Sequence, residues 1–403
     1  MRDVLIIGAG PAGLTLGCYL ARAGISHLIV ERGHHPRPHV GESLMPATMA
    51  ILREIGFHPI LEVGHFPRSG GVVYHTGSGE PVSVPYEEFP QEGMDQDHTY
   101  HVDRAKFDML LLKYAESIGC DILQGATVGE VLFDERGFAS GALVDLPGQS
   151  IDVRARIIVD AGGRSTLLGR QLDLRHPRGT LDQFALHAWF EGVDRGAADT
   201  ADYTHVFLLP DLRGWAWMAA IDDSISSIGL VADRTRFQQT GIDPKEFFDS
   251  AVTQQPALMT ALRHARRINE LKGEVNYSYR LSQVCGDGWL AIGDAAQFID
   301  PVFSSGVSVA MHSARFAAER IQTALEGDDV SRGAFETYEK SLLAGTEEWE
   351  EFVQLFYSNA AAFAGMVASP QHRQGMLRMI QGGADASAAG RTVEAMRVAA
   401  GAR

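Results

Sequence analysis

The sequence predicts an α/β fold in which a parallel, Rossmann-like sheet is combined with an antiparallel sheet and C-terminal helices. The first observation is a short aliphatic run at residues 4–7, followed by a glycine-rich turn and a stretch of helical composition at 14–23. A continuous aliphatic run is typical of a strand buried on both faces of a parallel sheet. The second observation is a series of β-rich runs with short connections between residues 184 and 231, which is typical of antiparallel strands. The third is helical composition at 307–326 and 334–358.

The glycine-rich turn has the G-x-G-x-x-G pattern of a dinucleotide-binding site. Gly8 permits a tight turn, Gly10 lets the backbone approach a pyrophosphate, and Gly13 lets the following helix pack closely on the strand. The N-terminus of that helix offers unpaired N–H groups to phosphates. A second strand at 27–30 ends at Glu31, where an acid can accept hydrogen bonds from a ribose. The pattern predicts bound FAD or NAD rather than NADP.

Composition excludes several classes of function. The 403 residues suggest two or three folding units, and the net charge of −16 argues against a nucleic-acid partner, since such partners bind basic surfaces. The three cysteines are far apart in sequence, which predicts no disulfide framework and a reducing, cytoplasmic location. No apolar run reaches the ~18 residues of a membrane span, and the chain opens on a strand rather than a signal peptide. The loop with His34, His35 and His39 is interpreted as part of the nucleotide site, with no metal.

Further segments carry a resemblance to one superfamily of flavoproteins. A predicted strand at 289–292 is followed by Asp294 and then by small residues at which a helix is expected to begin. The chain continues as FIDPVFSSGV at 298–307. These segments resemble the second flavin motif of flavin-dependent halogenases and of class A FAD-dependent monooxygenases. The DAGGRS segment at 160–165 resembles their middle motif, and GESLMP at 41–46 resembles a segment that geranylgeranyl reductase-like flavoproteins share. The resemblance favours FAD over NAD.

The resemblance implies a glutathione-reductase-type FAD-binding domain that is discontinuous in sequence. We expect it to comprise residues 1–65, 100–175 and 280–330, with an antiparallel substrate-binding sheet domain at 66–99 and 176–279 and a C-terminal helical region at 331–403. The last twenty residues are expected to be a frayed helix or a tail. The residues expected to bind FAD are Gly8, Gly10, Pro11, Ala12, Gly13, Glu31, Arg32, Glu42, Ser43, Arg104, Val128, Asp160, Gly162, Asp294, Pro301, Ser305, Gly306 and Val307.

Two segments on the substrate side distinguish halogenation from hydroxylation in this superfamily. Halogenases of this kind carry a lysine in the segment that matches residues 66–71, where this chain has Ser69 beside Arg68. Their Trp-x-Trp-x-Ile-Pro motif is present only as Trp215 and Trp217, without Ile-Pro. The chain contains five lysines, and the first is Lys106.

We therefore predict an FAD-dependent monooxygenase that hydroxylates or otherwise oxidises a small or medium-sized, biosynthetic substrate through a flavin C4a-hydroperoxide. Flavin-dependent halogenase is the alternative, and a reductase of the geranylgeranyl reductase type is a further one. The catalytic residues stay unassigned. Ser69, His187, Trp215 and Trp217 are the substrate-side candidates. The reductant is either NAD(P)H itself or a separate flavin reductase, and the substrate is free or tethered to a carrier protein.

Overall fold

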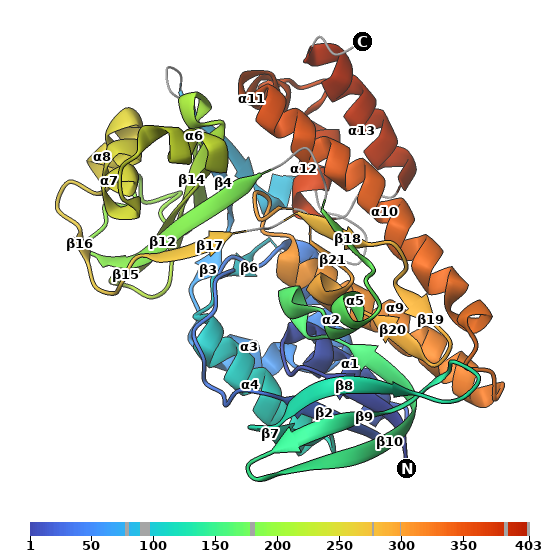
Figure 1. Ribbon diagram of the computed structural model, residues 1–403. Coiled ribbons are helices and arrows are strands. Elements are labelled where there is room, and N and C mark those ends of the chain that lie inside the picture. The colour runs from blue at the N-terminus through green and yellow to red at the C-terminus, as the bar shows by residue number, and fades with distance from the viewer. Residues whose placement is uncertain are drawn as a thin grey trace.

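A computed structural model describes residues 1–76, 80–88, 97–177, 182–275, 278–298, 300–382 and 386–400. It has the predicted fold class, with a largely parallel sheet, a second sheet that is mainly antiparallel, and a group of C-terminal helices (Figure 1). No helix in the described part of the chain combines the length and the apolar character that a membrane crossing requires.

The first sheet is built around the N-terminal strand. Strand β1 pairs in parallel with β2 on one side and with β10 on the other, so that Val4 lies opposite both His27 and Ile157. Residues 4–6 have no exposed surface, as expected for a strand covered on both faces. The strands of this sheet are β1 (Arg2–Ile7), β2 (His27–Glu31), β7 (Asp121–Gln124), β8 (Thr127–Phe133), β9 (Ala139–Leu146), β10 (Gln149–Asp160), β19 (Cys285–Gly286) and β20 (Trp289–Ala291).

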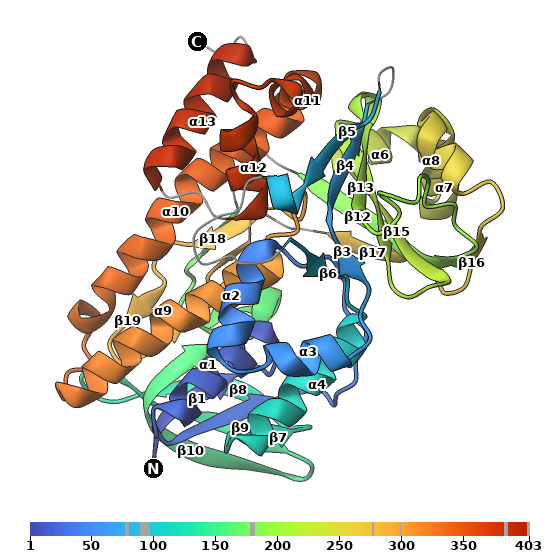
Figure 2. The same ribbon diagram turned by 180° about the vertical axis from the view of Figure 1, so that it is seen from behind.

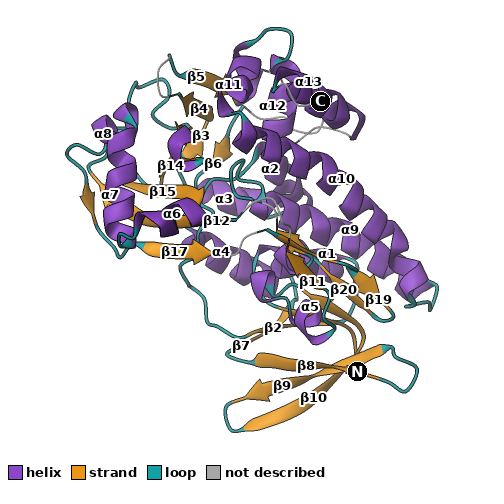
Figure 3. Ribbon diagram, turned by 45° about the horizontal axis from the view of Figure 1, so that its top comes forward, coloured by secondary structure: helices purple, strands orange, loops and turns teal. Residues whose placement is uncertain are grey.

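Helices and an antiparallel extension cover the two faces of this sheet. Helices α1 and α9 pack side by side against it (Figure 2), although they are about three hundred residues apart in sequence. Strands β8, β9 and β10 form the extension, which projects from the rest of the molecule (Figure 3). The helices around this sheet are α1 (Pro11–Arg22), α2 (Pro46–Glu54), α3 (His58–Val63), α4 (Arg104–Ser117), α5 (Leu167–Gln171) and α9 (Gly306–Glu326).

The second sheet joins two segments that are distant in the chain. Four of its strands follow one another as antiparallel neighbours, but β4 pairs with β13 in parallel, with Val72 opposite Thr204. Hairpin neighbours must be antiparallel, whereas strands joined by a long connection are free to be parallel. Its strands are β4 (Gly71–His75), β5 (Val82–Pro85), β12 (Gln183–Glu191), β13 (Thr204–Leu209), β14 (Gly214–Ala220), β15 (Ile225–Asp233), β16 (Arg266–Arg267) and β17 (Lys272–Val275), and helices α6 (Arg234–Thr240), α7 (Pro244–Gln254) and α8 (Pro256–Ala261) cover one face.

Short strands complete the connections between these layers. They are β3 (Arg68–Ser69), which pairs with β6 (Thr99–Tyr100), and β18 (Tyr279–Leu281), which pairs with β11 (Arg175–Pro177) and β21 (Gln297–Phe298). The residue limits given above for the three domains stay a prediction.

The C-terminal helices close the other face of the second sheet. They are α10 (Arg332–Ser358), α11 (Ala360–Ala368), α12 (Arg373–Gln381) and α13 (Ala386–Ala399). Helix α13 buries Val393 and Met396 in the same apolar cluster as Trp215. The end of the chain is therefore a packed helix through residue 399, and its alanines hide this in the sequence because they give no apolar periodicity.

Hydrogen bonds between three polar side chains link the layers. The Trp215 indole N–H donates to the Tyr357 hydroxyl (2.8 Å), and that hydroxyl donates to the carboxylate of Asp300 (3.1 Å). The three residues belong to the second sheet, the C-terminal helices and the loop that precedes α9. Burial raises the pKa of Asp300 to about 7, although the N–H of Val302 and the Tyr357 hydroxyl favour its charged form.

The close approach of α1 to the glycine turn gives a first prediction. A Cβ at Gly13 would overlap the carbonyl oxygen of Gly8, which is backbone and cannot swing aside. We expect Gly13→Ala to lower the free energy of unfolding by about 2 kcal/mol or more. Gly365→Ala, in α11, is the matched control, since a Cβ there meets nothing within 4 Å and alanine favours a helix by up to ~1 kcal/mol. Equal urea midpoints for the two variants would contradict the packing argument.

The buried carboxyl of Asp300 gives a second prediction. Its pKa is raised from 3.8 to about 7, so the folded protein binds more protons than the unfolded chain between these pH values. Its contribution to stability is therefore present at low pH and falls as the pH rises, by up to about 1.4 kcal/mol per pH unit in this window. Asp300→Asn keeps an acceptor for Tyr357 and cannot ionise. Urea unfolding at pH 5 and pH 8 should show a smaller loss for the variant than for the wild type; parallel losses would refute the assignment.

Candidate functional site

A cavity of about 440 Å³ lies where the carboxyl ends of the parallel strands meet the second sheet. Its wall combines the glycine turn, the ends of β2 and β10, the loop before α9, and side chains from β4, β13 and β14. Ligands of open α/β sheets bind at this end of the strands. Segments from the two predicted flavin motifs therefore meet in a single hollow.

The glycine turn shapes one end of the cavity. Gly8 has a φ of 103°, and a Cβ there would lie 2.6 Å from the carbonyl oxygen of Ala161. A Cβ at Gly10 would point into open space, which leaves room for a ligand close to the backbone. Helix α1 begins at Pro11 with no side chain capping its N-terminus, so its first N–H groups are available to an anion. This geometry fits a pyrophosphate.

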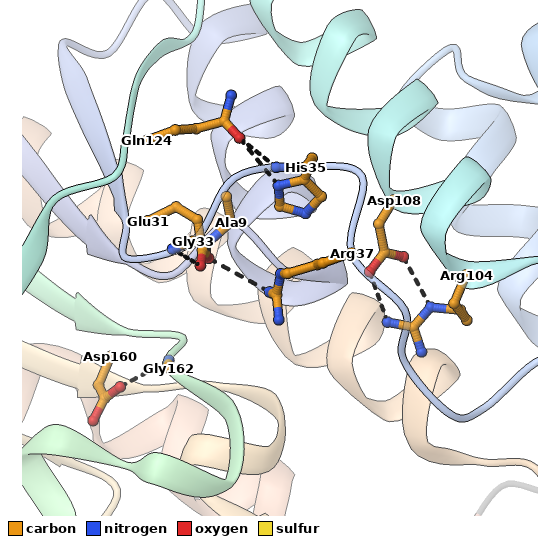
Figure 4. A network of polar contacts seen from close by, with 10 residues as sticks. All are labelled: Ala9, Glu31, Gly33, His35, Arg37, Arg104, Asp108, Gln124, Asp160 and Gly162. Carbon is orange, nitrogen blue, oxygen red and sulfur yellow. Dashed lines mark hydrogen bonds and ion pairs between the residues drawn. The ribbon is translucent and has the colours of Figure 1, made fainter. Parts of the chain in front are cut away.

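Glu31 stands at the tip of β2 beside this turn (Figure 4). Its carboxylate accepts hydrogen bonds from the N–H groups of Ala9 and Gly33, both at 2.8 Å, and Arg37 lies 3.5 Å away. Burial alone would raise the pKa of Glu31, but these donors and the arginine outweigh it and hold the pKa below its ordinary value. A fixed carboxylate with lone pairs to spare suits the two hydroxyls of a ribose.

A buried ion pair positions the segment after this loop. Arg104 donates to both carboxylate oxygens of Asp108, at 2.8 and 2.9 Å, and to the carbonyl oxygen of Val40 at 3.0 Å (Figure 4). The hydrogen bond to the Val40 carbonyl holds the backbone that leads to Glu42 and Ser43, which line the cavity. Desolvation, with the nearby positive charge of Arg104, lowers the pKa of His39 to about 4, so this imidazole is neutral at physiological pH.

Asp294 is the acid that the second motif brings to the cavity. Within the described chain its carboxylate has no hydrogen-bond partner, although it lines the cavity. Desolvation raises the pKa of Asp294 to about 6, and the positive charges of Arg164 and Arg104 limit this rise. An acceptor without a protein partner is a place for a ligand hydroxyl, as the ribityl chain of FAD offers. The residues present therefore fit FAD at both the phosphate end and the ribityl end.

Fifteen of the eighteen residues predicted to bind FAD line this cavity, and Gly13, Asp160 and Ser305 do not. Gly13 contacts the turn rather than a ligand. Asp160 is fully buried, and its carboxylate accepts from the N–H groups of Gly162 and Leu168, both at 2.9 Å (Figure 4). It therefore shapes the loop that reaches the cavity. Ser305 faces a second cavity of about 290 Å³ on the other side of its loop.

The substrate-side candidates divide into two pairs. Trp215 and Trp217 line the main cavity. Ser69 is fully buried and donates to the carbonyl oxygen of Gly71 at 3.4 Å, and His187 lies on β12; neither lines either of the two described cavities. Burial lowers the pKa of His187, which keeps the ring neutral. The same two cavity walls contain no lysine among the described residues.

Several residues of the cavity wall were missed in the sequence. Thr204 accepts or donates at 2.8 Å to both Ser43 and the buried His101, and thereby joins the second sheet to the cofactor side. Tyr74 and Tyr86 line the same cavity as the flavin segments. The alternation of apolar residues in β4 indicates a shared face for Val72 and Tyr74, but nothing in the sequence shows that this face meets the glycine turn.

Comparisons with known proteins identify the family of the chain. The family model for the FAD binding domain matches residues 1–352. The chain is 38% identical over 401 residues to a 1H-pyrrole-2-carbonyl-[peptidyl-carrier protein] chlorinase of Pseudomonas fluorescens, covering 94% of this chain and 89% of the relative. It is 28% identical to the corresponding brominase of Pseudoalteromonas luteoviolacea, covering 94% and 91%. The solved flavin-dependent brominase Bmp2 superposes with a TM-score of 0.89 at 27% identity, covering 98% of each chain.

These relatives overturn the predicted reaction. The monooxygenase prediction depended on Ser69 standing where halogenases carry lysine and on the absence of Ile-Pro after Trp217. It is wrong, because the relatives that match nearly the whole chain are halogenases. The predicted FAD cofactor and flavoenzyme class are confirmed. The chain belongs to the FAD-binding domain family, in its flavin-dependent halogenase-like branch.

Proposed function

We propose that this protein is a flavin-dependent halogenase that acts on an aromatic acyl group tethered to a carrier protein, with pyrrole-2-carbonyl as the first candidate. The observation that carries the proposal is a single cavity that runs from the FAD-type site to an apolar wall with two tryptophans. Two relatives, a chlorinase and a brominase, are named for a pyrrole-2-carbonyl group on a peptidyl carrier protein. They support both the reaction and the tethered substrate.

The residues of the cavity have separate tasks in this proposal. Gly8, Gly10 and the start of α1 hold the pyrophosphate of FAD, Glu31 holds its ribose, and Asp294 holds the ribityl hydroxyls. Bound FAD, once reduced, supplies the oxidising power that converts a halide ion to an electrophilic halogen with oxygen. The loop at 301–307 lines the cavity and would contact the ring of bound FAD, where backbone N–H groups at its Ser-Gly would hold the halide.

The aromatic wall controls where the oxidant goes. Trp215 and Trp217 would keep bulk water and the substrate away from the ring, so that the oxidising power of the bound cofactor is used on the halide and is not lost to water. Since the described cavity wall contains no lysine, the proposal assigns no lysine to the delivery of the halogen. This differs from the route that the family resemblance implied.

The proposal includes partners and a location. A separate flavin reductase supplies electrons, since the sequence shows only one dinucleotide fingerprint. The carrier protein presents the substrate. The three free, buried cysteines are consistent with a reducing cytoplasm.

The proposed reaction requires halide and oxygen. The purified protein, FAD, a flavin reductase with NADH, and pyrrole-2-carbonyl on a carrier protein should give a halogenated product with chloride or bromide. Replacing halide with nitrate should abolish this product, and mass spectrometry of the carrier arm measures it. A hydroxylated product under nitrate, or turnover without oxygen, would refute the proposal.

The proposed role of Asp294 gives a separate test. Removal of a charged acceptor should weaken FAD binding by about tenfold or more, since such hydrogen bonds contribute ~1.5–3 kcal/mol. We expect this for Asp294→Ala in a fluorescence titration of the apoprotein with FAD. Asp152→Ala is the control, because Asp152 pairs with Arg154 on the exposed end of β10. The same affinity in both variants would count against Asp294.

A further inference from the structure

Two tyrosines in the cavity wall have hydroxyl groups that the protein does not use. Tyr74 is 1% exposed and Tyr86 is 6% exposed, and both line the main cavity. Within the described chain neither hydroxyl has a hydrogen-bond partner, and neither oxygen is sealed in the protein interior. A buried phenol normally finds a partner for its O–H, so both hydroxyls are open to a molecule in the cavity.

Other buried tyrosines of the described chain show the contrast. The hydroxyl of Tyr338 donates to the carbonyl oxygen of Ala291 at 2.7 Å, and that of Tyr357 donates to Asp300. Tyr279 donates to the carbonyl oxygen of Asp294. Each of these hydroxyls makes a hydrogen bond to another element of the fold. The hydroxyls of Tyr74 and Tyr86 make no such bond within the described chain.

The two rings are held firmly in the wall. Tyr74 lies on β4 and packs edge-on against Phe363, with ring centroids 5.4 Å apart. Tyr86 follows β5, its N–H donates to the carbonyl oxygen of Gly70 at 2.9 Å, and its carbonyl oxygen accepts from Gln381 at 3.3 Å. Rigid placement lowers the entropy cost of using these hydroxyls to bind a ligand.

Both hydroxyls act as donors at physiological pH. Burial, with a smaller effect of Tyr86, raises the pKa of Tyr74 well above its ordinary value, and burial also raises the pKa of Tyr86. The phenols therefore stay protonated, and each O–H can donate to an acceptor atom of the ligand. In a pyrrole-2-carbonyl thioester the ring N–H is a donor whose lone pair belongs to the aromatic ring, so the carbonyl oxygen is the acceptor.

We propose that the hydroxyls of Tyr74 and Tyr86 form the polar subsite of the substrate cavity and bind the carbonyl oxygen of an aromatic acyl thioester. This inference rests on the proposed function and names its substrate contact. Hydrogen bonds to the carbonyl fix the acyl group in the wall, while the neighbouring Val72, Val206 and Phe303 supply apolar contact with the ring. The orientation of the ring then decides which carbon receives the halogen.

The test compares two probes on the FAD-loaded protein without turnover. One probe is the pantetheine thioester of pyrrole-2-carboxylate, and the other has a methylene in place of the carbonyl. Calorimetry should show that the wild type prefers the thioester by about tenfold, and that this preference falls toward one in Tyr74→Phe, Tyr86→Phe and the double variant. Tyr114→Phe is the control, since its hydroxyl donates to the carbonyl oxygen of Ile55 far from the cavity.

The outcomes separate this inference from the proposed function. An unchanged preference in all three cavity variants, or a wild type that binds neither probe, overturns the subsite even if halide-dependent turnover is found with another substrate. A preference that the cavity variants lose, in a protein that never halogenates, overturns the proposed function and leaves the subsite intact. Unchanged FAD affinity and melting temperature in the variants show that the loss belongs to the hydroxyls. During turnover, the same variants should give a mixture of halogenated positions where the wild type gives fewer.

Discussion

The hydrogen-bonded chain from Trp215 through Tyr357 to Asp300 is the contact on which the cavity depends. Its members come from the second sheet, the C-terminal helices and the loop before α9. Each is buried, so each must find its partner inside the protein. The geometry of one layer is thereby transmitted to the other two, and the loop at 301–307 is held at a defined distance from the tryptophan wall.

This arrangement divides the cavity by chemistry. The end formed by the parallel sheet offers backbone N–H groups, Glu31 and Asp294, which suit a long, hydrophilic and anionic cofactor. The end formed by β4, β13 and β14 offers aliphatic and aromatic side chains with a few hydroxyls. The boundary between the two ends is where the proposed reaction would bring cofactor and substrate together.

The missing lysine is the chain's main departure from the halogenase pattern. The resemblance predicts Ser69 in its place, but Ser69 is fully buried and donates to the carbonyl oxygen of Gly71, so it does not substitute for an amine. The hydroxyls of Tyr74, on β4, and of Tyr86, directly after β5, line the cavity instead. They suit a carbonyl better than a proton relay because they remain protonated. Substrate placement, rather than an added catalytic base, is therefore the function we assign to this wall.

The sequence by itself determined the parts of the protein whose physics is local. The aliphatic run at 4–7, the glycine spacing at 8–13 and the acid at 31 constrain neighbouring residues of one βαβ unit, so the fold class, the FAD cofactor and most of the cofactor-side wall were predictable. It did not determine the reaction, because a single position at 69 says little about a cavity built from many segments. Only the tertiary structure placed Thr204 beside Ser43, buried the carboxylate of Asp160, and brought Tyr74 and Tyr86 into the same cavity wall as the flavin segments. The hydrogen bond between Ser43 and Thr204 joins residues that are 161 positions apart. Contacts of this kind depend on how whole layers pack, which no local pattern encodes.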